Sequence, residues 1–334
     1  MRVRRSWRGA LTAAGAEALH RSGATRLLRR AAKRRVQILV YHRVGDSDDA
    51  FLPCTPRATF ERQMEHLAAE YRVCGLEEAA ERLRRDDVAD ATVVLTFDDG
   101  YRDNYTHAFP ILRRYGLTAT IFLATDAIGT GRILWHDRVF RAFAATRRSE
   151  LREFGPQRAT HPLGTADERA AARSHVLEFL RRLTPEQRAS WLDRLVEQLG
   201  VDEPAAVPEL MLGWDEVREM QRAGLSFGSH TVTHPILATL APDEARRELI
   251  ASKAEIERQL ERPVTTFAYP NGRRSDFDES SKRLLAETGY TLAVTTLPGA
   301  NRPAADPLEL RRDGVRDEAA APFAARLTWN RLCS

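Results

Sequence analysis

The sequence predicts a barrel-like α/β fold of about seven parallel strands, with a helical insertion and a basic N-terminal segment. From residue 36 onward, short apolar runs alternate with segments of helical periodicity, an order typical of parallel strands covered by helices. Between Trp135 and about Leu212 the apolar runs disappear and Arg-rich, helix-like sequence takes their place. We therefore divide the chain into a basic segment, 1–35, and a main domain, 36–334, that contains the insertion at about 135–212.

The predicted strands are apolar runs that mostly end in a polar residue or glycine. In chain order they are VQILVYH (36–42), YRVCG (71–75), TVVLTF (92–97), LTATIFL (117–123), LSFGS (225–229), VTTFAY (264–269) and YTLAVTT (290–296). Helices are expected between them; in residues 55–71, for example, Phe60, Met64 and Leu67 share one face. The other expected helices are 76–85, 103–115, 242–261 and 278–289, and the insertion includes the helical stretch TPEQRASWLDRLVEQLG (184–200).

The net charge of +4 hides an uneven distribution. Residues 1–35 hold eleven Lys and Arg against the single acid Glu17, whereas the rest of the chain carries an excess of acidic side chains. The high isoelectric point therefore does not indicate a nucleic-acid-binding protein. Residues 10–31 are expected to form a basic helix that either contacts an anionic membrane surface or is an ordinary solvated or docked helix.

No apolar run is long enough for a secretory core or a membrane-spanning helix. The expectation is a cytoplasmic protein, or one peripheral to the inner membrane leaflet. The three cysteines, Cys54, Cys74 and Cys333, are odd in number and lack metal-ligand spacing, so each is interpreted as a reduced thiol.

Polar residues that directly follow apolar runs are the candidates for chemistry, because in such folds the carboxyl ends of the strands carry the site. Asp98 and Asp99 in LTFDDG are two like charges at one strand end, an arrangement that a divalent cation would stabilise. His230 and His234 in GSHTVTHP have a spacing that lets both imidazoles reach one metal ion. The alternatives are a charged turn for the first motif and a pair of surface histidines for the second.

Three motifs together, TFDDG, SHTVTHP and FAYPNG, resemble those of the polysaccharide deacetylases with a NodB-homology domain, carbohydrate esterase family 4. The resemblance covers roughly residues 36–315. It implies a distorted (β/α) barrel that removes acetyl groups from N-acetylated sugars with a metal-activated water. It also implies Asp98 as general base and Asp99, His230 and His234 as ligands of a divalent metal, usually zinc, with cobalt or nickel as substitutes. Tyr269, Pro270 and Asn271 then correspond to a loop that binds substrate, with the amide of Asn271 stabilising the oxyanion.

The sequence departs from the family pattern in two places. No histidine follows His234 to serve as general acid, so we assign this role to His42 in ILVYHRV, a motif that resembles the poly-N-acetylglucosamine deacetylases of bacterial exopolysaccharide systems. Ala268 stands where the family usually has an arginine. Arg311 or Arg312 can replace that arginine, although we interpret both as surface residues.

Trp135, His136 and Asp137 open the insertion and are expected either to line the sugar-binding cleft or, in the case of Trp135, to belong to the core. The predicted function is thus that of a metal-dependent N-deacetylase acting on a polysaccharide or lipid-linked glycan. Two alternatives remain: a non-catalytic carbohydrate-binding protein with the same fold, and an amidase acting on a non-sugar amide.

Overall fold

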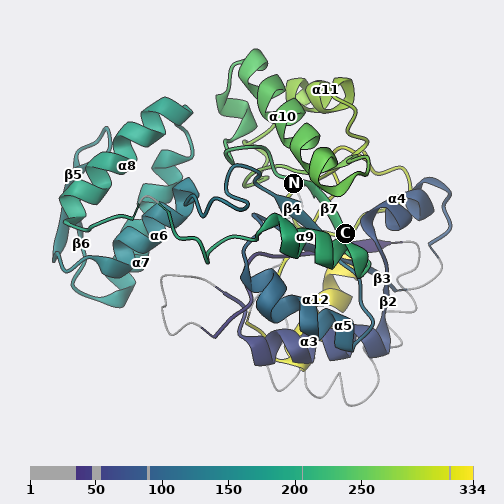
Figure 1. Ribbon diagram of the computed structural model, residues 1–334. Coiled ribbons are helices and arrows are strands. Elements are labelled where there is room, and N and C mark those ends of the chain that lie inside the picture. The colour runs from purple at the N-terminus through teal and green to yellow at the C-terminus, as the bar shows by residue number, and fades with distance from the viewer. Residues whose placement is uncertain (1–34, 47–53, 89–90, 205, 316, 334) are drawn as a thin grey trace.

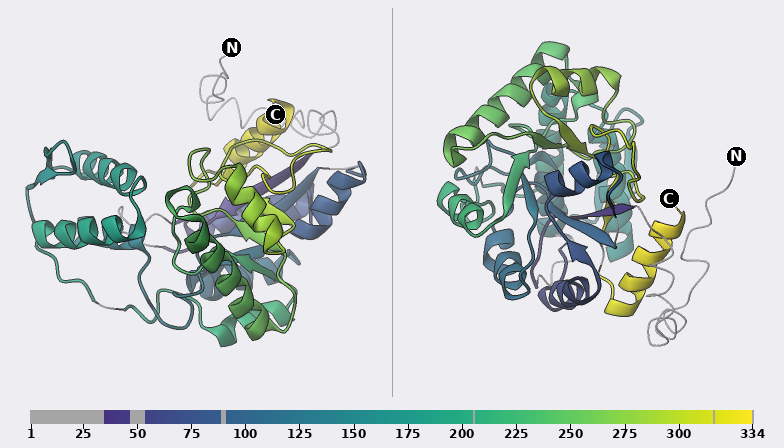
Figure 2. Two further views of the ribbon diagram at one scale, coloured as in Figure 1. Left: turned by 90° about the horizontal axis from the view of Figure 1, so that it is seen from above. Right: turned by 90° about the vertical axis from the view of Figure 1, so that its right-hand side faces the viewer.

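The structure is a computed structural model that describes residues 35–46, 54–88, 91–204, 206–315 and 317–333. Its main sheet has eight strands, all paired in parallel, in the order β10-β1-β3-β4-β7-β8-β9 with β2 beside β3. The sheet curls and carries helices on its outside (Figures 1 and 2), which confirms the predicted distorted barrel. The strand bounds are β1 (Val36–Tyr41), β2 (Arg72–Val73), β3 (Thr92–Phe97), β4 (Thr120–Leu123), β7 (Ser226–Ser229), β8 (Thr266–Ala268), β9 (Leu292–Val294) and β10 (Asp313–Gly314).

All seven strands predicted from the sequence are present, and β10 is an additional two-residue strand. Every residue of β1 and β3 is buried, which explains why both read as continuous apolar runs rather than as alternating patterns. The register pairs Val36 with Thr92 and Tyr41 with Phe97. Because the two strands run in the same direction, the residues that follow Tyr41 and Phe97 emerge at the same end of the barrel.

Among the described residues, seven α-helices pack around this sheet. They are α3 (Arg57–Glu70), α4 (Leu76–Arg84), α5 (Phe109–Arg114), α9 (Trp214–Arg222), α10 (Pro242–Leu260), α11 (Glu279–Glu287) and α12 (Ala320–Cys333). The predicted apolar face of α3 is confirmed, since Phe60, Met64 and Leu67 are completely buried in the main core. The C-terminal helix α12 packs beside α3 and accepts a 2.8 Å hydrogen bond from the Gln37 side chain at the Leu327 carbonyl.

The insertion stands to one side of the barrel (Figure 1) and has its own apolar core. Its helices are α6 (Trp135–Ala145), α7 (Ala166–Leu180) and α8 (Pro185–Leu199). The expectation that it contains no strands is wrong, because β5 (Glu150–Phe154) and β6 (Ala159–Pro162) form an antiparallel hairpin. Only Leu151 and Phe154 of β5 are buried, so its exposed charged residues hid the strand signal.

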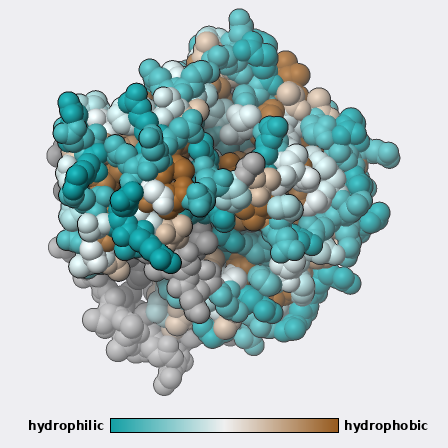
Figure 3. Space-filling model, turned by 60° about the vertical axis from the view of Figure 1, so that its left-hand side comes forward, coloured by the Kyte–Doolittle hydropathy of each residue, from teal (hydrophilic) through white to brown (hydrophobic). Residues whose placement is uncertain are grey.

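The basic segment, with its expected helix at 10–31, lies outside the described residues apart from Arg35. None of the described helices is both long and apolar enough to span a membrane. Cys54 and Cys74 are free thiols, as expected. On the face shown in Figure 3, hydrophilic side chains cover most of the surface and apolar ones gather toward the middle.

Candidate active site

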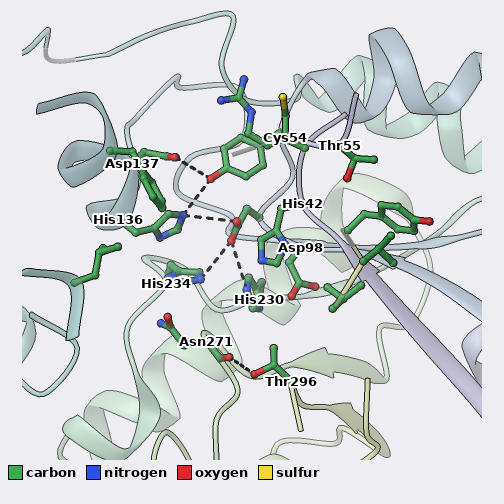
Figure 4. A pocket seen from close by; sticks show the side chains of 18 of the residues that line it. His42, Cys54, Thr55, Asp98, His136, Asp137, His230, His234, Asn271 and Thr296 are labelled. Carbon is green, nitrogen blue, oxygen red and sulfur yellow. Dashed lines mark hydrogen bonds and ion pairs between the residues drawn. The ribbon is translucent and has the colours of Figure 1, made fainter. Parts of the chain in front are cut away.

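A cavity of about 560 Å³ opens between the carboxyl ends of the strands and the insertion. The barrel contributes residues that follow β1, β3, β7 and β8, and the insertion contributes side chains from α6 and α7. The lining includes His42, Asp98, Asp99, His230, His234 and Asn271 from the barrel and Trp135, His136, Asp137 and Arg181 from the insertion. Six of the predicted strand-end site residues therefore meet in one cavity (Figure 4).

A sharp turn after β3 lets two adjacent aspartates serve the same cavity. Asp99 has a φ of 74° and Gly100 a φ of 84°, so the backbone passes through the left-handed region. Glycine suits the backbone conformation at residue 100, and a Cβ atom there would also have to displace the end of the Ile128 side chain, 2.7 Å away. Both aspartates are almost completely buried, yet their carboxylates have different partners.

Asp98 pairs with Arg312, which is completely buried directly before β10. Two guanidinium nitrogens donate to the two Asp98 oxygens at 2.7 Å each, and the third donates to the Thr295 carbonyl at 2.8 Å. Burial opposes ionisation of Asp98, but interactions led by the charge of Arg312 outweigh it and lower the carboxyl pKa. The interpretation of Arg312 as a surface residue is wrong. Of the two arginines considered from the sequence, Arg312 is the one that pairs with Asp98, and it directly precedes β10, a strand that the sequence did not reveal.

Asp99 faces the two histidines of the loop after β7. Its Oδ1 lies 3.5 Å from His230 Nε2 and 3.3 Å from His234 Nε2, and candidate ligand atoms of the three residues lie within 4.8 Å of one another. Neither Asp99 oxygen has a hydrogen-bond partner, although both are buried. Such orphaned oxygens beside two imidazoles fit a bound cation, because an uncompensated buried carboxylate is costly.

The protonation of His230 also suits a metal ligand. Its Nδ1 lies 2.7 Å from the Ala268 carbonyl, which can only accept, so Nδ1 carries a proton and Nε2 keeps a lone pair. Burial lowers the pKa of both His230 and His234 despite the nearby aspartates, which favours the neutral, ligating form. These three residues can therefore hold a divalent metal.

Beside the Asp99, His230 and His234 group, the cavity contains a second set of interacting polar side chains, to which the insertion contributes His136 and Asp137. His136, from the first turn of α6, has Nε2 3.7 Å from Asp99 Oδ2 and 3.1 Å from the Tyr101 hydroxyl. Tyr101 in turn donates to the buried Asp137 carboxylate at 2.9 and 3.0 Å. Burial opposes the charged form of His136, but Asp137 and Asp99 outweigh it and raise its pKa. Tyr101 was not singled out from the sequence, although it directly follows the LTFDDG motif.

In the loop after β8, Asn271 lines the cavity, whereas Tyr269 and Pro270 do not. Asn271 has a φ of 59°, its buried side-chain nitrogen lacks a partner, and in Figure 4 its amide lies next to His234. Tyr269 and Pro270, which the sequence also assigned to this site, are not brought to the cavity wall. Tyr269 stacks on Phe277 with a centroid separation of 4.3 Å and donates its hydroxyl to the Leu308 carbonyl at 2.9 Å.

His42 and Trp135 lie at different places in the cavity wall. His42 follows β1, is exposed, and lies beside Asp98 (Figure 4). Trp135 packs in the insertion core, as one expectation had it, and also lines the cavity, where it lies under the Arg188 guanidinium at 4.8 Å.

Comparisons with known proteins agree with this geometry. Residues 85–293 match the family model of polysaccharide deacetylases. The chain is 25% identical over 268 residues to YxkH of Bacillus subtilis (strain 168), whose name assigns it to the polysaccharide deacetylases. That alignment covers 80% of this chain and 66% of YxkH, slightly less than two thirds of the relative.

Two solved structures have the same fold. The deacetylase PplD of Streptococcus pyogenes, in complex with acetate, superposes with a TM-score of 0.61 at 22% identity and covers 89% of this chain and 99% of its own. IcaB of Ammonifex degensii has a TM-score of 0.58 at 20% identity and covers 88% of this chain and 97% of its own. Since the matched model spans more than half of the sequence, the chain belongs to the polysaccharide deacetylase family.

Proposed function

We propose that this protein is a metal-dependent hydrolase that removes acetyl groups from N-acetylated sugars of a polysaccharide or lipid-linked glycan. The observation that carries the proposal is the division of two adjacent carboxylates. Both carboxylates line the same cavity. Asp99, whose two buried oxygens lack hydrogen-bond partners, faces His230 and His234, and Asp98 pairs with Arg312. The Asp99 carboxylate is thus available to bind a cation, and the Asp98 carboxylate is available to accept a proton.

A divalent ion held by Asp99, His230 and His234, most simply zinc, would supply Lewis acidity toward water and the acetyl carbonyl. Cobalt or nickel would suit the same mixed nitrogen and oxygen ligands. Three protein ligands are typical of catalytic zinc sites, whereas structural zinc sites usually have four.

Asp98 is the general base in this proposal. The charge of Arg312 keeps its carboxylate ionised, and the two hydrogen bonds from Arg312 fix its orientation. Asp98 accepts a proton from the attacking water as the carbonyl carbon becomes tetrahedral. The candidate donor to the developing oxyanion is the backbone N–H of Asn271, and the side-chain nitrogen of the same residue, which is buried without a hydrogen-bond partner, is a second one.

Cleavage of the carbon–nitrogen bond requires a proton for the departing amine. We assign its delivery to His42, which is exposed to the cavity beside Asp98 and can exchange protons with solvent. His42 lies outside the region matched by the family model, so this assignment depends on its position alone.

Acetate release tests the proposal directly. Zinc-loaded protein incubated with N-acetylglucosamine oligomers should release acetate and free amine in equal amounts, and the Asp98→Asn variant should bind zinc but release at most about a hundredth as much. Bound acetate in the PplD structure makes acetate a reasonable product to measure. Absence of acetate from all acetylated oligosaccharides tried, with zinc bound, would favour a carbohydrate-binding protein or an amidase with a non-sugar substrate.

A further inference from the structure

We propose that Glu248, on α10, is a positioning residue that sets the metal affinity of His230 and His234. Its carboxylate holds the turn that carries the two histidines, although it does not reach the metal ligands itself. This inference builds on the metal site of the proposed function.

The turn between the two histidines has an unfavourable backbone conformation. Thr231 has a φ of 70° and His234 a φ of 58°, both in the left-handed region. A β-branched residue such as threonine rarely adopts this conformation, and such conformations persist where surrounding contacts enforce them. The turn therefore needs partners outside itself.

Glu248 is one such partner and uses both of its oxygens. Oε2 accepts hydrogen bonds from the backbone N–H groups of Val232 and Thr233 at 2.7 and 3.0 Å, and Oε1 accepts from the Thr233 hydroxyl at 2.7 Å. An ionised acceptor makes these bonds stronger than those between neutral groups. A single side chain thus fixes the two residues that separate Thr231 from His234.

The other groups of the turn have separate anchors. The carbonyls of Thr231 and Val232 accept from the backbone N–H groups of Thr125 and Asp126 at 3.1 and 3.0 Å. Within the turn, the Thr231 hydroxyl accepts from the His234 N–H at 3.0 Å. Helix α10 is also tied to the start of the turn, because the Ser252 and Ser229 hydroxyls lie 2.7 Å apart. The loop after β4 therefore anchors the carbonyl side of the turn, and Glu248 anchors its N–H side.

This arrangement couples Glu248 to metal binding through geometry. The Nε2 atoms of His230 and His234 both converge on Asp99 Oδ1, at 3.5 and 3.3 Å. Metal–ligand distances tolerate deviations of only about 0.2 Å, so a small rotation of the turn moves His234 out of the ligand set. Residues that orient ligands typically change metal affinity by about 10–100-fold when removed.

The test is the zinc affinity of the full-length protein, measured by competition with a chromophoric chelator. We expect Glu248→Ala to weaken zinc binding by about 10–100-fold, and Glu248→Gln, which keeps one acceptor oxygen, to weaken it less. The matched control is Glu244→Ala, because Glu244 lies on the same helix and its carboxylate accepts a 3.1 Å bond from the Ala241 N–H at the helix start. This control should lower thermal stability but leave zinc affinity within about twofold of wild type.

A second readout distinguishes positioning from general stabilisation. The cobalt-loaded protein has a visible absorption spectrum that reports ligand geometry, and this spectrum should change in Glu248→Ala but not in Glu244→Ala. Unchanged zinc affinity and an unchanged cobalt spectrum in Glu248→Ala would overturn the role of Glu248 alone. A wild-type protein that binds neither metal would overturn the proposed function as well. If Glu248→Ala does not fold, Glu248→Gln is judged by the same criteria.

Discussion

Arg312 and Asp98 lie 214 positions apart in the chain, yet their side chains form a completely buried bidentate ion pair. The pair connects the end of β3 with the residue that directly precedes β10. It holds a buried carboxylate ionised and fixed in direction, which are the two properties a general base requires.

Replacing Arg312 with Lys should lower kcat/KM by roughly 10–100-fold, because lysine keeps the charge but loses the two parallel bonds to Asp98. Arg312 lowers the Asp98 pKa, so weakening the pair raises it. A base must be deprotonated to act, and the acidic limb of the kcat/KM profile should therefore move to higher pH. The control is Arg311→Lys, since Arg311 donates to the Pro298 carbonyl rather than to Asp98. An acidic limb that stays in place would contradict the assigned role.

Replacing His42 with Ala should lower kcat by about 10²–10⁴-fold through loss of the general acid. The zinc content should be unchanged, because His42 does not belong to the Asp99, His230 and His234 group. Elemental analysis and acetate release on the same sample measure both quantities. Turnover at the wild-type rate would exclude His42 as the acid and direct attention to His136, the other cavity histidine outside the ligand group.

Replacing Tyr101 with Phe should destabilise the protein by about 1–3 kcal/mol, because the buried Asp137 carboxylate loses its donor. Burial raises the Asp137 pKa and the Tyr101 bond lowers it, so the variant's folded pKa rises further above the unfolded value. A raised carboxyl pKa disfavours the ionised folded state, and the loss of stability should be larger at pH 7 than at pH 4. Urea unfolding at both pH values measures it. Tyr105→Phe is the control, because its hydroxyl bonds Glu219 on the surface; an equal loss in both variants would contradict the expectation.

Chelation of divalent ions should abolish acetate release, and zinc, cobalt or nickel should restore it. Because zinc binds the folded state, a free concentration of about 1,000 times Kd should raise the free energy of unfolding by about 4 kcal/mol. Asp99→Ala should remove both effects while leaving the Asp98–Arg312 pair intact. Thermal unfolding with and without zinc gives the measurement, and an equal zinc-induced shift in Asp99→Ala would argue against this site.

Replacing Arg181 with Ala should destabilise the contact between the insertion and the barrel. Arg181 on the insertion pairs with Asp276 after β8 at 2.5 Å, and both side chains are buried. Removal of one partner of a buried pair typically costs about 3–5 kcal/mol, since the other charge is left uncompensated. Arg182→Ala is the control, because Arg182 pairs with Glu178 on the surface and should cost less than about 1 kcal/mol. Urea unfolding measures the free energy of unfolding of both variants. A similar decrease in both would contradict a structural role for the Arg181–Asp276 pair.

The strands of the barrel were predictable because both faces of a parallel sheet are buried, and burial leaves continuous apolar runs such as those of β1 and β3. The hairpin β5–β6 was not, since only Leu151 and Phe154 of β5 are buried, three positions apart across a register shift, and the residues between them are charged. The two-residue strand β10 leaves no periodicity at all.

The shared site was predictable because parallel strands end on the same side of a sheet, which brings together residues that follow different strands. These residues are Asp98, Asp99, His230 and His234. The buried position of Arg312 was not predictable, because its partner Asp98 follows a strand that is distant in sequence. The contact between Tyr101, His136 and Asp137 depends on how the insertion docks on the barrel, and no local pattern encodes that docking.

Because His42 directly follows the first strand of the barrel and Arg312 directly precedes the last, the site draws on residues from both ends of the barrel's sequence. A nascent chain synthesised only as far as β9 already contains Asp98, Asp99, His230 and His234. It lacks Arg312, however, so Asp98 has no counter-ion. Its carboxylate then opposes burial, which delays closure of the core around it. Catalytic competence therefore requires synthesis to proceed past Arg312, and chains that terminate before this residue should be both unstable and inactive.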